Sequence, residues 1–416
     1  MKKKVIVIGG GFAGIQFIRK LDATKFEVLL IDKINHYQFQ PLFYQVATSQ
    51  LEPSSISFPL RNIFNRAKNV QIRLAEVQSI NTVSKQVITT IGTFDYDEVV
   101  IAIGCKTNFF GNQELAKHCL TLKTTYEAIQ IRNHILQLFE RILSASEEEK
   151  QALLNLVIVG AGPTGVELAG AFAEIKQHIL PKDYPGIDFS KFNIYLVEGS
   201  KNTLGNMSAA SQKESRHYLQ SMGVQLKLET IVKSYDGQLL TFTSGEQLTT
   251  RSVIWAAGVT GNSIKGLERV VITPNNRIKV NRQNAVLNHE HIYAIGDIAY
   301  METTKYPKGH PQVANVAINQ AKVLAKNLNQ DNSKTLIDFE FNDPGSMATI
   351  GRNKAVVDLP HLHLKGYPAW VIWMFLHLMF ILSVRNKLII FINWAWAYVT
   401  KDSSLRLILL PKKDPS

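Results

Sequence analysis

The chain has 416 residues, of which 45% are hydrophobic and 19% charged, a composition that excludes disordered and fibrous proteins. This length exceeds what a single hydrophobic core usually organises, so two domains and an appendage are expected. The formal net charge of +12 fits either a nucleic acid or an anionic membrane as partner. Two cysteines, Cys105 and Cys119, are too few for a disulfide framework, and we predict buried thiols in a reducing compartment. No Cys/His spacing indicates a metal site.

The N-terminus carries no pattern of a secretory signal. Met1-Lys2-Lys3-Lys4 is followed by only four apolar residues, Val5–Ile8, and then by glycines. A signal peptide needs a longer apolar stretch and a small-residue cleavage site. We therefore expect an N-terminus that stays in the cytosol and is not removed.

A first glycine-rich motif follows this apolar run, which itself predicts a buried parallel strand. The stretch Gly9-Gly10-Gly11-Phe12-Ala13-Gly14 matches G-x-G-x-x-G and leads into a predicted helix. The first glycine permits a tight turn, the second lets a pyrophosphate approach, and the third lets helix and strand pack closely. The next predicted strand ends at Asp32, whose carboxylate can accept hydrogen bonds from a ribose. The glycines concerned are Gly9, Gly11 and Gly14.

The same motif occurs again near the middle of the chain. Leu156–Val159 predicts a buried strand, and Gly160-Ala161-Gly162-Pro163-Thr164-Gly165 repeats the glycine spacing. Its acidic partner is Glu198, which follows the predicted strand Ile194–Val197 after an inserted turn. A carboxylate at that place repels a 2′-phosphate, so the motif favours NADH over NADPH. Two such motifs make an internal repeat, in which one dinucleotide stays bound for redox chemistry and the other exchanges. The glycines concerned are Gly160, Gly162 and Gly165.

A third segment, Ile292–Asp297, predicts a strand that ends in Gly296-Asp297. With it the chain resembles the two-dinucleotide flavoprotein superfamily that includes the disulfide reductases. The resemblance implies an α/β fold with two Rossmann-like domains, for FAD and for NADH, the second inserted in the first. It also implies that Asp297 and Gly296 contact FAD, that Gly104 lies near FAD and that Gly258 lies near NADH.

Three stretches point to a narrower family. They are His36–Thr48, with the sequence HYQFQPLFYQVAT, then Gly165–Gly170, and the apolar tail from Trp370. Together they resemble type II, non-proton-pumping NADH:quinone oxidoreductases. Thiol-dependent reductases of the superfamily need a cysteine pair near the flavin, which this chain lacks. By this resemblance Glu167 lies near the nicotinamide and the quinone, and the flavin is lined by Phe39, Gln40, Pro41 and Gln45.

One departure from the family concerns the quinone site. The family commonly has Ala-Gln-x-Ala-x-Gln beside the flavin, whereas this chain has Ala314-Asn315-Val316-Ala317-Ile318-Asn319. Asn315 and Asn319 keep the amides but hold them one methylene closer to the backbone. Gln320 cannot replace Asn319, since neighbouring helix positions point about 100° apart. The two asparagines are either quinone contacts or helix residues satisfied by nearby backbone groups.

The C-terminal tail combines apolar runs with basic residues. Trp370–Val384 and Leu388–Val399 are each shorter than the roughly 20 residues that span a bilayer, and Arg385-Asn386-Lys387 separates them. Two interfacial helices fit best, because tryptophan and tyrosine prefer the headgroup level and basic side chains suit anionic lipid. A dimer interface and a true span are the alternatives. The tail's charged residues are Arg385, Lys387, Lys401, Arg406, Lys412 and Lys413 against Asp402 and Asp414.

These patterns predict four segments. They are an FAD-binding domain at 1–115, an NADH-binding domain at 116–280, a return to the FAD-binding domain at 281–350 and a C-terminal membrane-attachment region at 351–416. The resemblance implies electron transfer from NADH through FAD to menaquinone or ubiquinone, on the cytoplasmic face of the cell membrane, with a homodimer as a further option. Another acceptor, such as oxygen or a small redox protein, and a membrane-bound NADH sensor are alternatives. A nucleic-acid partner is disfavoured, because the basic residues form no patterned helix or stacking module.

Overall fold

The computed structural model describes residues 1–331, 335–402 and 405–409, and the chain divides into two compact units. Unit 1 comprises Met1–Gln38, Phe58–Lys106 and Val259–Asn342, and unit 2 comprises Phe39–Ser57, Thr107–Gly258 and Asp343–Ser416. The long middle segment of unit 2 thus interrupts the sequence of unit 1, as the predicted insertion requires. The two compact units reflect how the chain packs, whereas the four predicted segments are assigned by the cofactor that each would bind. The bounds of those four segments therefore stay a prediction. Lys412, Lys413 and Asp414 lie outside the described residues.

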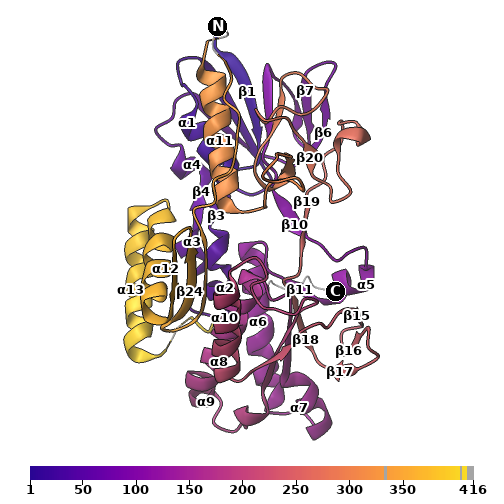
Figure 1. Cartoon of the computed structure of the whole chain (residues 1–416), viewed down its shortest axis with the longest axis vertical. Helices are drawn as coiled ribbons and strands as arrows, with labels where there is room; N and C mark the ends of the chain where they lie inside the picture. Colours follow the sequence, from indigo (N-terminus) through magenta and orange to yellow (C-terminus); the bar gives the residue numbers. More distant parts are fainter. Residues whose placement is uncertain (332–334, 403–404, 410–416) are drawn as a thin grey trace. The chain divides into compact units, whose positions relative to one another are not determined.

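Unit 1 is built on a five-stranded parallel sheet in the order β21-β9-β1-β2-β5. The buried run Val5–Ile8 lies in the central strand β1 between β9 and β2, and helices α1 and α11 pack against each other (Figure 1). An antiparallel sheet, β6-β7-β8, joins the same core. The bounds in this unit are β1 Lys3–Ile8, α1 Phe12–Lys20, β2 Phe26–Asp32, α4 Leu60–Ile63, β5 Val70–Leu74, β6 Val77–Asn81, β7 Gln86–Thr89, β8 Gly92–Asp95, β9 Glu98–Ile101, β20 Ile278–Lys279, β21 Ile292–Ala294, β22 Ala299–Tyr300 and α11 Ala314–Asn329.

Unit 2 repeats this arrangement with the parallel order β11-β18-β12-β13-β14. The order β9-β1-β2-β5 in unit 1 corresponds to β18-β12-β13-β14 here, which is the internal repeat that the two glycine motifs predict. The bounds are α2 Phe43–Ala47, α3 Pro53–Ile56, α5 Gln113–His118, β11 Leu120–Thr121, α6 Thr125–Ile142, α7 Glu147–Leu153, β12 Asn155–Val159, α8 Pro163–His178, α9 Leu180–Asp183, β13 Asn193–Val197, α10 Ala209–Ser221, β14 Val224–Lys227, β15 Val232–Tyr235, β16 Leu239–Phe242, β17 Gln247–Thr249 and β18 Ser252–Trp255.

The C-terminal part of unit 2 is a three-stranded antiparallel sheet followed by two helices. The strands are β23 Ser346–Gly351, β24 Lys354–Leu359 and β25 Leu362–Lys365, and the helices are α12 Gly366–Phe380 and α13 Val384–Thr400. Helix α12 packs on β24 and on α13. Figure 1 shows the helices α12 and α13 side by side. Among the described residues, no helix has the length and apolar content that a bilayer crossing requires.

The break between the two tail helices differs from the predicted one. Arg385-Asn386-Lys387 does not separate the helices but forms the first turn of α13, and the break lies at residues 381–383. The reason is Asn386, which is buried and donates its side-chain amide to the carbonyls of Ser54 and Ser55 at 3.0 Å each. A polar triplet that looked like a linker is therefore an anchor of α13 on α3.

Helix α8 is fixed to strand β23 by an unusually close backbone contact. A side-chain carbon at Gly170, in the middle of α8, would stand 1.7 Å from the carbonyl oxygen of Ile350 in β23. Only glycine lets the helix and the strand approach this closely. The contact sets the distance between the residues of α8 and those of β23, and it places Glu167 beside Thr349.

We expect Gly170→Ala to lower the free energy of unfolding by about 3 kcal/mol, because the added methyl group forces α8 and β23 apart. Alanine has a higher helix propensity than glycine, by about 1 kcal/mol, so helix propensity alone would raise the free energy of unfolding of this variant. Chemical denaturation measures the change. Gly186→Ala is the control, since that position faces open space. A Gly170→Ala variant as stable as the parent would show that the close contact is not needed.

Candidate active site

The first glycine loop is held by the carboxylate that ends the neighbouring strand. Asp32 accepts hydrogen bonds from the backbone N–H of Gly10 at 2.6 Å and of Ile34 at 2.9 Å. Gly9 has φ +105°, and a side chain there would collide with the carbonyl of Ala102. The carboxylate thereby joins the loop to strand β2 and retains further lone pairs for a ribose hydroxyl.

The second loop has the same construction. Glu198 accepts hydrogen bonds from the N–H of Ala161 and of Ser200, both at 2.8 Å. Gly160 has φ +102°, and a side-chain carbon there would stand 2.8 Å from the backbone of Ala256. Although Glu198 comes late in the sequence, it occupies in unit 2 the position that Asp32 occupies in unit 1, at the end of the neighbouring strand with its carboxylate bonded to the glycine loop.

Both loops leave room for a phosphate at a helix N-terminus. No heavy atom outside the immediate chain neighbours lies within 4 Å of the place that a side-chain carbon would take at Gly11 or at Gly162. These two glycines are the N-caps of α1 and α8, and neither helix start is capped by a side chain. Uncapped N–H groups and the helix dipole favour an anion. The two loops thus fit the pyrophosphates of two dinucleotides.

A third group of residues surrounds the turn at Gly296-Asp297 in unit 1. The Cys105 thiol donates to a carboxylate oxygen of Asp297 at 3.0 Å, and Gln312 donates to its backbone carbonyl at 3.0 Å. Gly296 has φ +76°, and its N–H donates to the side chain of Gln320 at 2.8 Å. The turn is thereby fixed from three elements, with the carboxylate of Asp297 held in one orientation.

The cysteines differ from the prediction of buried thiols. Both cysteines are only partly buried: Cys105 begins the short strand β10 Cys105–Thr107, and Cys119 lies between α5 and β11. Burial nonetheless raises the pKa of the Cys119 thiol to about 12, so that it stays protonated. Within the described ranges, no cluster of three metal-ligating side chains occurs.

Of the predicted crossing residues, Gly104 and Gly258 both have positive φ, +66° and +73°. Gly104 belongs to unit 1 and faces open space, whereas Gly258 belongs to unit 2, where its carbonyl accepts a hydrogen bond from Asn108 at 3.3 Å. Each glycine lies three residues after the end of a parallel strand, β9 for Gly104 and β18 for Gly258.

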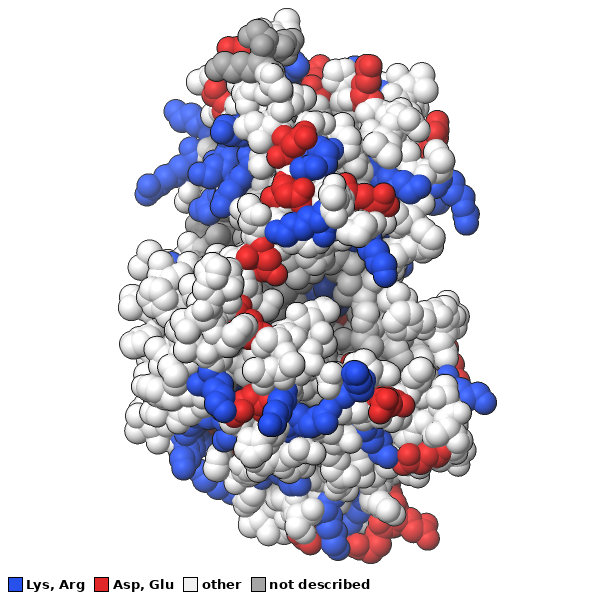
Figure 2. Space-filling model, in the orientation of Figure 1, with Lys and Arg blue, Asp and Glu red and all other residues white. Residues whose placement is uncertain are grey.

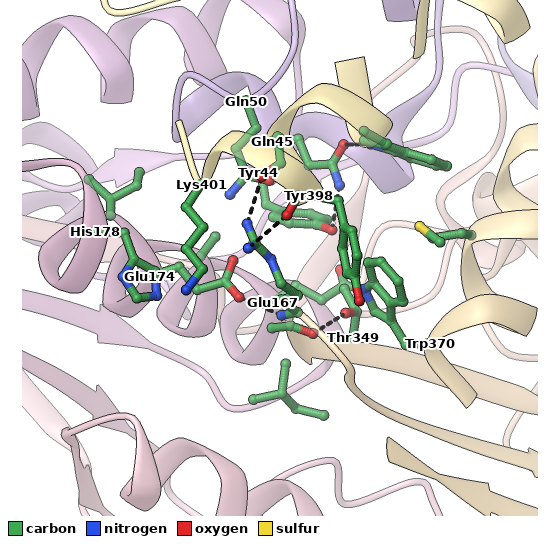
Figure 3. A pocket seen from close by; sticks show the side chains of 18 of the residues that line it. Tyr44, Gln45, Gln50, Glu167, Glu174, His178, Thr349, Trp370, Tyr398 and Lys401 are labelled. Carbon is green, nitrogen blue, oxygen red and sulfur yellow. Dashed lines mark hydrogen bonds between the residues drawn. The ribbon is translucent and has the colours of Figure 1, made fainter. Parts of the chain in front are cut away.

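Glu167 lies in unit 2 at the edge of a cavity of about 100 Å³ (Figure 3). The cavity is bordered by α2, α8, β23, α12 and the end of α13. Its wall is largely aromatic, and its other end carries charged side chains. The aromatic residues are Tyr44, Trp370, Trp373, Trp394 and Tyr398, and the charged or titratable residues are Glu167, Glu174, His178, Arg352, Lys401 and Asp402.

Burial raises the pKa of Glu167 to about 8, from 4.5. The backbone of Thr349 and the side chain of Trp373 act in the opposite direction but are outweighed. The Trp373 indole N–H makes no well-aligned hydrogen bond to any residue in the described part of the chain. Glu167 can therefore hold or release a proton near neutral pH, as a general acid or base requires.

Gln40 and Gln45, the predicted flavin-lining glutamines, belong to unit 2 and differ in exposure. Gln40 is exposed at the surface of its unit. Gln45 is buried, donates to the Tyr44 hydroxyl at 2.9 Å and accepts from the Trp394 indole at 2.8 Å. Gln45 therefore links α2 to helix α13.

Asn315 and Asn319 lie on the first turns of α11 in unit 1 and are partly exposed. Asn319 accepts a long hydrogen bond, 3.5 Å, from Lys322, and no backbone group satisfies it among the described residues. Gln320 points to the core instead and holds the Gly296 turn, in keeping with the expected difference in direction. The amides of the two asparagines thus remain able to bind another molecule.

The comparisons with known proteins agree with this arrangement. Residues 3–321 match the family described as pyridine nucleotide-disulphide oxidoreductase, and residues 344–402 match the NDH2 C-terminal domain. A type II NADH:quinone oxidoreductase of Mycobacterium tuberculosis is 30% identical, over 96% of this chain and 89% of its own length. The internal alternative NAD(P)H-ubiquinone oxidoreductase A1 of Arabidopsis thaliana mitochondria is 27% identical, over 96% and 84%. The solved structure of NDH2 from Plasmodium falciparum in complex with NADH has a TM-score of 0.90 at 21% identity, covering 99% of this chain and all of that one.

The fold and the two loops define a flavoprotein oxidoreductase with two dinucleotide-binding regions. Within that class the chain belongs to the type II NADH:quinone oxidoreductase family. The predicted fold class, the family and the use of FAD and NADH are confirmed. Sequence reasoning predicted no site role for Tyr44, Trp373, Glu174 or Cys105, because the segments that surround them in the fold are distant in the sequence.

The raised pKa of Glu167 predicts how stability depends on pH. Between about pH 4.5 and 8 the folded protein keeps a proton that the unfolded chain has released, so stability falls as pH rises through this window. Glu167→Gln removes the effect. We expect the variant to match the parent near pH 4.5 and to gain on it by up to roughly 1.4 kcal/mol per pH unit towards pH 8.

Chemical denaturation of the flavin-loaded proteins between pH 4.5 and 9 measures this difference. Glu148→Gln, on the surface of α7, is the control and should parallel the parent throughout. Stability curves of Glu167→Gln and the parent that stay parallel would mean that Glu167 has an ordinary pKa.

Proposed function

We propose that this protein transfers electrons from NADH through FAD to a membrane quinone, menaquinone or ubiquinone, without pumping protons. The balanced reaction is NADH + H⁺ + quinone → NAD⁺ + quinol. The observation that carries the proposal is the pairing of two carboxylate-held glycine loops with a buried carboxyl group, Glu167, whose pKa lies near neutrality. The family membership supports it.

In this proposal the first loop and the Gly296 turn hold FAD, and the second loop holds NADH. The FAD-binding residues are Gly9, Gly11, Gly14, Asp32, Gln40, Gln45, Gly104, Gly296 and Asp297, and the NADH-binding residues are Gly160, Gly162, Gly165, Glu198 and Gly258. Bound FAD supplies the redox chemistry, accepting a hydride from NADH and passing two electrons on. The protein contributes alignment and exclusion of water.

Three residues are proposed to serve the acceptor. Asn315 and Asn319 contact the quinone through their side-chain amides, which the structure leaves largely without backbone partners. Glu167 handles a proton that the quinone takes up, since its raised pKa lets it exist in both forms near pH 7. Glu198 selects NADH, because its carboxylate, fixed by two N–H groups, repels a 2′-phosphate.

The proposal is tested by anaerobic stopped-flow absorbance of the flavin in detergent-held protein. We expect rapid reduction by NADH, much slower reduction by NADPH, and reoxidation by a menaquinone analogue at the rate of ordinary turnover. Asn315→Ala with Asn319→Ala should slow reoxidation about tenfold or more while reduction by NADH stays unchanged, since each polar contact contributes about 1 kcal/mol. Fast reduction without reoxidation by any quinone would exclude the quinone as acceptor and favour a protein acceptor or a sensor.

We further propose peripheral, monotopic attachment to the cytoplasmic face of the cell membrane through α12 and α13. Large apolar side chains recur at helical spacing and face outward on both helices, with Phe391 56% and Trp396 63% exposed. On the face that Figure 2 shows, the surface over these helices is almost free of charged side chains. A patch of this kind indicates a membrane or protein contact. The exposed residues are Val371, Phe375, Met379 and Phe380 on α12, and Val384, Leu388, Phe391, Ile392, Trp396 and Val399 on α13.

The double substitution Phe391→Ser and Trp396→Ser should lower binding to vesicles of anionic lipid at least about tenfold, since burying each aromatic side chain contributes roughly 1.5–3 kcal/mol. Vesicle flotation measures the bound fraction. Tyr126→Ser, which removes an equally exposed aromatic ring from α6, is the control. If vesicle binding persists and a homodimer dissociates instead, the two helices form a dimer interface.

A further inference from the structure

We propose that a polar path along α8, from His178 through Glu174 and Tyr44, delivers to Glu167 the solvent proton that quinone reduction consumes. The inference rests on the proposed function, in which each turnover takes up one proton from solution. The proton moves from water at the cavity mouth by way of His178 to Glu174, then through Tyr44 and cavity water to Glu167, and on to the reduced quinone. NADH is oxidised and the quinone reduced, so no further reactant is needed.

The path follows one face of α8. Glu167, Ala171, Glu174 and His178 are spaced by four, three and four residues and all line the same cavity. This spacing places them one above another on a helix surface, with about 10 Å between the first and second carboxyl positions. Figure 3 shows Glu167, Glu174 and His178 bordering the cavity in this order. The small side chain of Ala171 leaves the space between the two acids open.

Tyr44 lines the same cavity from α2. Its hydroxyl accepts a hydrogen bond from Gln45 at 2.9 Å, which leaves the hydroxyl proton for another partner. Burial raises the pKa of Tyr44 well above its usual value, and the charges of both Glu167 and Glu174 raise it further. The ring is therefore within electrostatic reach of both carboxyl groups. A hydroxyl that donates and accepts can pass a proton without ever becoming charged itself.

Water completes the path. A cavity of about 100 Å³ with polar groups on its wall has room for several water molecules. Trp373, a residue only 1% exposed, lines the same cavity and acts on Glu167 through its side chain. Direct hydrogen bonds between the two acids are thus not required.

The outer end of the path is arranged to take up protons. Glu174 is partly exposed, unlike Glu167, and burial raises its pKa against the opposing effect of Arg352 and Lys354. His178 has a lowered pKa, because of burial and the positive charges of Lys401 and Arg352, and is thus a neutral acceptor. The titratable and charged groups facing Glu174 are Glu167 and His178 on α8, Tyr44 on α2, Arg352 and Lys354 at the β23–β24 turn, and Tyr398, Lys401 and Asp402 at the end of α13.

A purely structural role of Glu174 is the competing explanation. Its carboxylate accepts a hydrogen bond from the N–H of Arg352, whose guanidinium in turn donates to the carbonyls of Ala397 and Tyr398. Glu174 could thus simply anchor the β23–β24 turn. Glu174→Gln separates the two roles, since glutamine keeps the accepting oxygen but cannot release and regain a proton.

The test compares parent, Glu174→Gln and the surface control Glu148→Gln by anaerobic stopped flow with a menaquinone analogue. We expect Glu174→Gln to leave flavin reduction by NADH unchanged and to slow reoxidation by quinone at least about tenfold, as loss of assisted proton transfer does. Its deficit should grow with rising pH and show a larger solvent deuterium isotope effect. Added acetate or formate should restore part of the rate by carrying protons into the cavity.

The outcomes are distinct. Reoxidation of Glu174→Gln at the parent rate at every pH would overturn the path, and so would a slow rate that small acids do not restore. If Glu174→Gln does not fold or does not retain FAD, Tyr44→Phe takes its place in the test, because it keeps the ring and removes only the hydroxyl. The same two measurements, the reoxidation rate and its restoration by small acids, then decide whether the path exists. A parent protein that no quinone reoxidises would instead contradict the proposed function itself.

Discussion

The backbone contact between Gly170 and Ile350 is the constraint on which the rest of unit 2 depends. It holds α8 against β23 more closely than any side chain would allow. Helix α8 starts at the second glycine loop and carries Glu167 and Glu174, and β23 leads into the turn that holds Arg352. One close approach therefore relates the dinucleotide loop, the buried acids and the wall of the cavity to one another.

The burial of Glu167 is the energetic consequence of this packing. Removing a carboxyl group from water disfavours its charged form, and among the described residues no cation lies close enough to reverse that effect. Burial of Glu167 therefore lowers the stability of the folded protein at high pH, and it also brings the pKa of this group near neutrality. Such groups concentrate where chemistry occurs.

Much of the molecule could be predicted from local sequence. The glycine loops, Asp32 and Glu198 depend on short spacings within a strand–loop–helix unit, and the structure places both acids as expected. What escaped prediction depends on contacts between distant segments. Trp394 meets Gln45 across 349 residues, and Asn386 meets Ser55 across 331. The start of α13 was therefore misplaced, because its anchoring partners lie in α3.

The repeated architecture allows a comparison within one chain. Two residues after the third glycine, the helix of unit 1 carries Gln16 and the helix of unit 2 carries Glu167. Both positions follow the same loop and the same strand order, yet one side chain is a neutral amide and the other an acid. A duplicated binding unit leaves one copy free to change while the other keeps its cofactor. In the proposed mechanism this difference of one functional group separates a helix that only supports a nucleotide from one that also exchanges protons.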